Sequence, residues 1–167
     1  MHDDWIHLRS ELSAIVRDPI RGIRPADVLL RVSPPGLAIT TPRAAAFRRL
    51  LRSLVAAATW GGEVDALHLS ASWDVGEAGG RCGLRLGVWS RRRETDHRAG
   101  SGCDGIETAL LADVRRHLEK VGGGALEIES RGRGQLACEL RLDAVHPAWE
   151  GTVESFLAAF APSTPAA

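Results

Sequence analysis

One helical stripe constrains the fold more than any other feature of the 167-residue chain. It lies in residues 47–60, FRRLLRSLVAAATW, where apolar residues recur at intervals of three and four, as on one face of an amphipathic α-helix. The stripe consists of Phe47, Leu50, Leu51, Leu54, Val55 and Ala58. Thr41 is a typical N-cap, Pro42 suits the first helical position, and Gly61 and Gly62 end the helix. Such a face has to be buried, so the sequence predicts a layered domain.

Composition excludes several classes of function. The chain has 21 basic and 21 acidic residues, so no global field recruits nucleic acid or an anionic membrane. No apolar run approaches the roughly 18 residues of a membrane span, and the N-terminus does not resemble a secretory signal. Three widely spaced cysteines without a C-x-x-C motif favour neither disulfides nor a zinc site. We therefore expect no metal and a reducing, cytoplasmic location.

Periodicity and turn residues predict the remaining elements. Helices are predicted at 5–16, 42–59 and 106–121. Strands are predicted at 27–33, 37–40, 64–73, 81–90, 126–130 and 136–142, and turns join the last four into two antiparallel hairpins. Residues 91–105 are polar and glycine-rich, which predicts a loop. The order favours an α+β two-layer sandwich, in which helices back a mixed, mostly antiparallel sheet.

The C-terminal residues are predicted to lie outside this domain. The domain is expected to span 1–145, with an appended amphipathic helix at 146–160 that opens at Pro147 and a disordered tail at 161–167. The apolar stripe of that helix is Trp149, Val153, Phe156, Leu157 and Phe160. It either folds back over its own domain, which is slightly favoured, or serves as a docking or dimerisation helix, because aromatic residues are enriched in interface centres.

The long helix with its turn, FRRLLRSLVAAATWGGEV, and the last hairpin, GGGALEIESRGRGQLACELRL, point to one family. They resemble the L-R-Q-V-L-L-N-L-L-S-N-A helix and the closing hairpin, G-G-x-L-x-I-x-S-x-x-G-x-G-T-x-F-x-L-x-L, of sensor histidine kinase ATPase domains. The resemblance covers roughly residues 4–142. It implies the Bergerat, or GHKL, fold: a mixed sheet backed by three helices, with nucleotide held between the two layers under a lid.

The resemblance implies a nucleotide pocket whose contacts are altered in this chain. The family's long helix carries two asparagines four residues apart, the second of which binds Mg²⁺; here these positions are Ser53 and Ala57. A methyl group cannot bind Mg²⁺, which requires oxygen ligands. Ser90 replaces the aspartate that accepts a hydrogen bond from adenine, and Gln135 replaces a threonine that helps to hold the base.

The family's second glycine box is also displaced. Its glycines bring amide N–H groups to phosphate at the start of a helix. Here they fall on Ala109 and Leu111, inside a predicted helix, while Gly100, Gly102 and Gly105 lie upstream. These glycines could replace the box only if the lid were re-registered. We therefore expect no catalytic residue and no cofactor, with ATP and Mg²⁺ bound only in a re-registered pocket.

Two further signals have simpler interpretations. Arg91, Arg92, Arg93 and Arg98 could bind an anion, because guanidinium groups suit phosphate and carboxylate. The same loop carries two acidic residues, so a solvated, self-neutralised loop is favoured.

His7 lies in a segment that resembles the phosphoacceptor motif H-E-L-R-T-P-L-x-x-I. No room follows for the second helix of a dimerisation hairpin, so an exposed helix histidine is favoured.

The sequence thus predicts a degenerate histidine-kinase ATPase-like domain, a pseudokinase that acts as a non-catalytic binding or scaffolding module in bacterial two-component signalling. A kinase or response regulator is the expected protein partner, and a homodimer is an alternative. One alternative function is a divergent ATP-binding catalytic domain of a histidine kinase that uses the upstream glycines. Another is a pocket that holds a different nucleotide or anion through the loop arginines.

Overall fold

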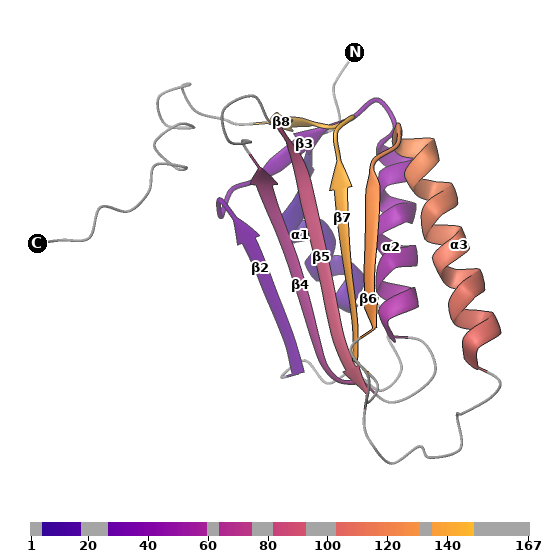
Figure 1. The fold of residues 1–167 in the computed structure, drawn as a ribbon. Coiled ribbons are helices and arrows are strands. Elements are labelled where there is room, and N and C mark those ends of the chain that lie inside the picture. The colour runs from indigo at the N-terminus through magenta and orange to yellow at the C-terminus, as the bar shows by residue number, and fades with distance from the viewer. Residues whose placement is uncertain are drawn as a thin grey trace, which may run out of the picture.

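Helices and strands follow one another in nearly the order that the periodicity predicts. The computed structural model describes residues 5–17, 27–59, 64–74, 82–92, 103–130 and 135–148. The helices are α1 (Leu8–Arg17), α2 (Ala44–Thr59) and α3 (Cys103–Val121). The strands are β1 (Ile6–His7), β2 (Val28–Ser33), β3 (Ala38–Thr40), β4 (Val64–Asp74), β5 (Gly83–Arg92), β6 (Ala125–Ser130), β7 (Gln135–Leu142) and β8 (His146–Ala148). The predicted α+β architecture is confirmed, because the three helices cover one face of a mixed sheet (Figure 1).

The main sheet has five strands in the order β2-β4-β5-β7-β6. β2 runs parallel to β4, and all other neighbours are antiparallel. Both predicted hairpins are confirmed as β4–β5 and β6–β7. Side chains alternate along β4: Leu67 and Leu69 are buried under the helices, whereas His68 and Ser70 are exposed on the opposite face. The sheet therefore has one packed face and one open face.

Helix α2 lies in the middle of the helical layer and supplies much of the core (Figure 1). All six residues of the predicted stripe are buried, including Phe47 and Leu50 at 0% exposure. The Thr41 Oγ1 atom accepts a hydrogen bond from the Arg43 amide at 3.2 Å, so the predicted N-cap is confirmed. The capped start and the apolar stripe together fix the position of α2 on the sheet.

A small second sheet, ordered β1-β3-β8, corrects the predicted first helix. Trp5, the first residue of the predicted helix at 5–16, lies outside α1 and is 39% exposed. Ile6 and His7 instead pair with Ile39 and Ala38, so the helix begins at Leu8 and His7 lies on a strand. Pairing with β3 buries Ile6 to 1% exposure, which favours the strand over another helical turn.

The same sheet corrects the predicted start of the last helix. His146–Ala148 form β8, in which Pro147 pairs with Ile39. β8 is an edge strand, where the missing N–H group of proline is tolerated. The domain thus reaches at least Ala148. The stripe Trp149, Val153, Phe156, Leu157 and Phe160 and the tail 161–167 lie outside the described residues.

Three glycines with positive φ end helix α3, as predicted: Gly122 at +128°, Gly123 at +91° and Gly124 at +156°. The Gly123 amide donates to the Leu118 carbonyl at 3.0 Å, which satisfies one of the last helical acceptors. A Cβ atom at Gly124 would collide with the carbonyl oxygen of Arg141 on β7. Gly124 is therefore required where the chain turns from α3 into β6 beside β7.

Replacing Gly124 with alanine is expected to lower the free energy of unfolding by about 2 kcal/mol, because a positive φ and a backbone contact both oppose a side chain. In Gly123→Ala only the positive φ opposes the new side chain, because no atom lies within 4 Å of its Cβ. This substitution should lower the free energy of unfolding by about 1 kcal/mol. Gly36→Ala is the control, since no atom lies within 4 Å of its added Cβ. Urea denaturation of the three variants measures the series, and equal costs for Gly124→Ala and Gly36→Ala would contradict it.

Candidate functional site

The positions that the resemblance singles out converge at one end of the domain. Ala57 lies in the last turn of α2, Ser90 lies near the end of β5, and Gln135 begins β7. Gln135 pairs with Arg91, the residue after Ser90, so the ends of β5 and β7 meet. Helix α3, which contains Gly105, starts at this same end of the domain (Figure 1). The fold thus brings together, at one end of the domain, these four positions that the resemblance assigns to the nucleotide pocket.

Ala57 is part of the packed core. Its exposure is 0%, and it belongs to the same buried cluster as the α2 stripe. The predicted stripe does not contain Ala57, and the structure extends the buried face of α2 to include it. Neither a free oxygen nor exposed surface is present at this position, so Ala57 itself offers nothing to a metal ion.

Ser53, the other position of the pair, is bound to α3. Its hydroxyl donates a hydrogen bond to Oδ2 of Asp113 at 2.7 Å, which links α2 and α3. Nε2 of His117 lies 3.4 Å from the same carboxylate oxygen. Nδ1 of His117 is buried, and no described residue forms a hydrogen bond with it. Both side chains are joined to the carboxylate, and no hydrogen bond between the imidazole and the hydroxyl is found among the described residues, so these contacts do not make the serine–histidine pair of a nucleophilic site.

The hydrogen bond from Ser53 is the main reason that the pKa of Asp113 lies below its ordinary value of 3.8. Burial opposes this shift, and the nearby His117, Arg116 and Lys120 add to it. A lowered pKa means that the ionised carboxylate is favoured in the folded state. Its stabilising effect is complete above the unfolded pKa and is lost as the pH falls through the folded value.

Replacing Asp113 with asparagine is expected to lower the free energy of unfolding at pH 7 by no more than about 1 kcal/mol, because solvent screens this half-exposed group. The difference from wild type should shrink as the pH falls from about 5 to below the ordinary carboxyl pKa. Urea denaturation at several pH values measures it. Ser53→Ala should cost more than Ser13→Ala, a half-buried serine on α1 with no such bond; a constant Asp113→Asn difference across the pH range would contradict the assignment.

Ser90 presents a buried hydroxyl with unused hydrogen-bonding capacity. It is 0% exposed, and its Oγ forms no hydrogen bond with any described residue. Its neighbours across the sheet are Leu67 and Leu136, which offer no polar side chain. An unsatisfied buried hydroxyl is costly, so Ser90 is the described side chain at this end that most needs a polar partner.

Helix α3 begins three residues before its predicted start, and this changes the position of one glycine. Gly105, expected in the loop, lies in the first helical turn, where amide groups lack helical acceptors. Ala109 and Leu111 lie inside the helix, as predicted. Gly100 and Gly102 lie outside the described residues, so the arrangement of the upstream glycines stays a prediction.

The loop arginines are only partly in a loop. Arg91 and Arg92 end β5, in register with Ala66 and Val64 of β4. Arg91 is exposed, and Arg93 and Arg98 lie outside the described residues. The prediction of a loop from residue 91 is therefore wrong at its start, because pairing with β4 and β7 extends the strand. An anion site made by all four arginines stays a prediction.

A basic cleft at the other end of α2 was not predicted. It has a volume of about 520 Å³ and is lined by Arg43, Arg49, His117 and Lys120 among others. The Arg43 Nη1 atom donates a hydrogen bond to the Lys120 carbonyl at 2.9 Å and links the start of α2 to the end of α3.

Among the described residues, no three His, Cys, Asp or Glu side chains could together hold a metal ion. No described helix is long and apolar enough to cross a membrane.

Sequence comparison and structure comparison give different results for this chain. No protein-family model matches the sequence, and no curated protein matches it. The fold, in contrast, matches solved histidine kinase domains. The nucleotide-free catalytic domain of histidine kinase ThkA superposes with a TM-score of 0.56 at 14% identity, over 86% of this chain and 97% of that domain.

Two mycobacterial structures give the same result. The ATP-binding domain of PrrB from Mycobacterium tuberculosis has a TM-score of 0.53 at 22% identity and covers 85% of this chain and 98% of its own. The mycobacterial sensor histidine kinase MprB has a TM-score of 0.50 at 13% identity, over 86% and 97% of the two chains. The chain therefore has the fold of histidine kinase ATPase domains, the GHKL type that the helix and hairpin patterns indicated.

Proposed function

We propose that this chain is a non-catalytic binding or scaffolding module with a histidine-kinase ATPase fold, acting in bacterial two-component signalling. The observation that carries the proposal is the complete burial of the Ala57 methyl group in the core. Binding of Mg-ATP requires an oxygen ligand for the metal, and position 57 supplies neither the atom nor the access. A kinase or a response regulator is the proposed protein partner.

The contact between Ser53 and Asp113 supports the same proposal. The hydroxyl of Ser53 is already engaged at 2.7 Å, so its use as a metal ligand would break a bond that joins α2 to α3. Neither Ser53 nor Ala57 could thus take part in binding Mg²⁺ without a structural cost. Both positions therefore support a module that does not transfer phosphate from Mg-ATP.

Calorimetric titration with ATP, with and without Mg²⁺, tests the proposal. We expect no saturable heat at micromolar nucleotide, whereas a catalytically complete histidine kinase ATPase domain serves as the positive control. Micromolar binding that vanishes when Mg²⁺ is removed would overturn the proposal. If such binding were also lost in Gly105→Ala, the divergent catalytic alternative would be favoured, because Gly105 lies in the first turn of α3.

A second candidate function is the binding of a different nucleotide or anion at the same end of the domain. The observation that favours it is the buried Ser90 hydroxyl, which can both donate and accept a hydrogen bond. Arg91, the next residue, is exposed and cationic. A hydroxyl that replaces a carboxylate also removes the charge that would repel an anionic ligand.

A thermal-shift screen with nucleotides tests this second candidate. A ligand present at a hundred times its Kd stabilises the folded state by about 2.7 kcal/mol, which corresponds to a rise in Tm of several degrees. Ser90→Ala should abolish the shift, whereas Ser72→Ala on the open face of the sheet should keep it. A screen without any shift would leave the protein-binding module as the proposed function.

A further inference from the structure

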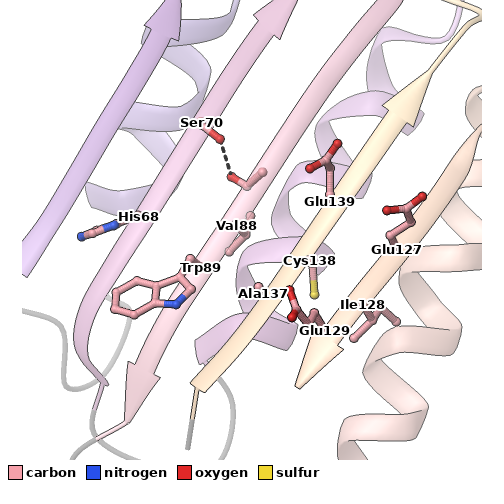
Figure 2. A pocket seen from close by; sticks show the side chains of 11 residues that line it. His68, Ser70, Val88, Trp89, Glu127, Ile128, Glu129, Ala137, Cys138 and Glu139 are labelled. Carbon is pink, nitrogen blue, oxygen red and sulfur yellow. Dashed lines mark hydrogen bonds between the residues drawn. The ribbon is translucent and has the colours of Figure 1, made fainter. Parts of the chain in front are cut away.

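The open face of the five-stranded sheet carries a tryptophan at the margin of a hollow. One row across the strands contains Leu29, His68, Trp89, Ala137 and Glu129. The Trp89 ring leans from β5 toward β4, with its centroid 4.7 Å from that of His68 (Figure 2). A hollow of about 460 Å³ on this face is lined by residues of β4, β5, β7 and β6, with Ala137 on its β7 side. Trp89 is itself one of the residues that line it.

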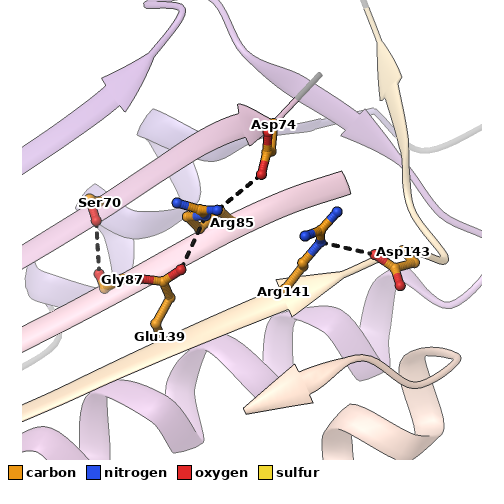
Figure 3. Close-up of polar contacts among 7 residues, drawn as sticks. All are labelled: Ser70, Asp74, Arg85, Gly87, Glu139, Arg141 and Asp143. Carbon is orange, nitrogen blue, oxygen red and sulfur yellow. Dashed lines mark hydrogen bonds and ion pairs between the residues drawn. The ribbon is translucent and has the colours of Figure 1, made fainter. Parts of the chain in front are cut away.

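One row of the same face carries opposite charges on its two edge strands. The next row contains Arg31, Ser70, Gly87, Glu139 and Glu127, from β2 to β6. Arg85 pairs with Glu139 at 3.1 Å and with Asp74 at 3.0 Å (Figure 3). Within the described part of the chain, no ion pair involves Arg31 or Glu127. A positive charge therefore remains at one edge of the face and a negative charge at the other.

We propose that this face binds the same face of a second copy of the chain, around a two-fold axis that lies in the interface along β5. Such an axis places β2 over β6 of the second copy and β4 over β7. Arg31 then faces Glu127 of the second copy, twice per dimer. Each Trp89 ring, displaced toward β4, comes to lie over the hollow of the other sheet. Two faces packed with nearly aligned strands form an ordinary β-sandwich contact about 10 Å thick.

Charge favours this dimer over a dimer with a different axis and over binding of the chain's own C-terminal segment. An axis across the strands would place Arg31 opposite itself, and like charges in an interface are repulsive. The chain's own segment 149–160 contains two glutamates and no basic residue, so it is poorly suited to the β6–β7 side. That side already sets Glu127 directly opposite Glu139, a cross-strand pair that an added cation stabilises. An arginine from a second copy supplies that cation.

A charge-reversal experiment on the full chain tests the proposal by analytical ultracentrifugation across micromolar to millimolar concentrations. Arg31→Glu alone and Glu127→Arg alone should each weaken dimerisation at least about tenfold, because each brings like charges together twice. Mixing the two single variants should restore a heterodimer, since both contacts then join opposite charges. The double variant should dimerise within about threefold of wild type. Arg9→Glu on α1, away from this face, is the control and should have no effect.

The contribution of Trp89 is tested separately. Trp89→Ala should weaken dimerisation at least about thirtyfold, as expected for a central tryptophan, whereas Trp5→Ala should leave it unchanged. Circular dichroism and thermal unfolding verify that these surface variants remain folded. A wild-type chain that stays monomeric throughout the concentration range would overturn the proposal, as would a dimer that ignores Arg31→Glu or single variants that fail to associate on mixing. A monomer in which segment 149–167 shields Trp89 from solvent would overturn it as well.

Discussion

Asparagine in place of Ala57 is expected to lower the free energy of unfolding by about 4 kcal/mol, and it should not create Mg-ATP binding. Position 57 is fully buried, so the amide side chain has to displace packed neighbours at a cost of about 1–3 kcal/mol. Its polar atoms would also lose their hydrogen bonds with water, which adds about 1–3 kcal/mol. Restoring the family's residue type is thus expected to damage the domain rather than to activate it.

Urea denaturation and calorimetric titration measure the two parts of this prediction. Ala56→Asn is a matched control, because Ala56 is the preceding residue on the same helix and is exposed. It should cost only about 0.7 kcal/mol, the difference in helix propensity. If Ala57→Asn cost no more than this control and bound nucleotide with Mg²⁺, the site would be open and the proposed function would be wrong.

Truncation of Phe47 to alanine is expected to destabilise the domain by about 4 kcal/mol, because it removes a large buried side chain and leaves a cavity. Phe47 is 0% exposed and begins the buried stripe of α2. The loss should be visible as a lower urea midpoint with an unchanged dependence on urea. Arg49→Ala, an exposed neighbour, should change the free energy of unfolding by less than about 0.5 kcal/mol. A similar, small effect of both substitutions would show that α2 is not central to the core.

The elements that sequence could predict are those whose signal is local. The stripe of α2 repeats over about three turns, and the β6–β7 hairpin alternates on both strands around a glycine-rich segment. β1 and β8 were missed because they contain only two and three residues and exist through pairing with β3. Trp5 and Pro147 were assigned to helices for the same reason. Local periodicity gives no signal for a short strand that forms only by pairing with a segment distant in the sequence.

The same distinction applies to the candidate site: its positions along the chain could be predicted, whereas its contacts between distant residues could not. The resemblance singles out Ser53, Ala57 and Ser90 because it fixes positions along the chain. Ala57 and Ser90 lie at one end of the domain, whereas Ser53 lies about one turn further inside α2. Their present contacts could not be predicted, because Ser53 and Asp113 are 60 residues apart. The basic cleft likewise depends on Arg43 and Lys120, which are 77 residues apart. Such pairs arise only when α2 and α3 pack together.

The small sheet determines where the described domain connects to its flanking chain. Ile6 and Pro147 stand on either side of Ile39 in one row, so they are separated by about two strand spacings, near 10 Å. Both strands run antiparallel to β3, so they run parallel to each other. A segment joined before β1 and a segment joined after β8 would therefore leave opposite ends of the small sheet. The geometry directs the two segments apart from starting points that are only a few strand spacings from each other.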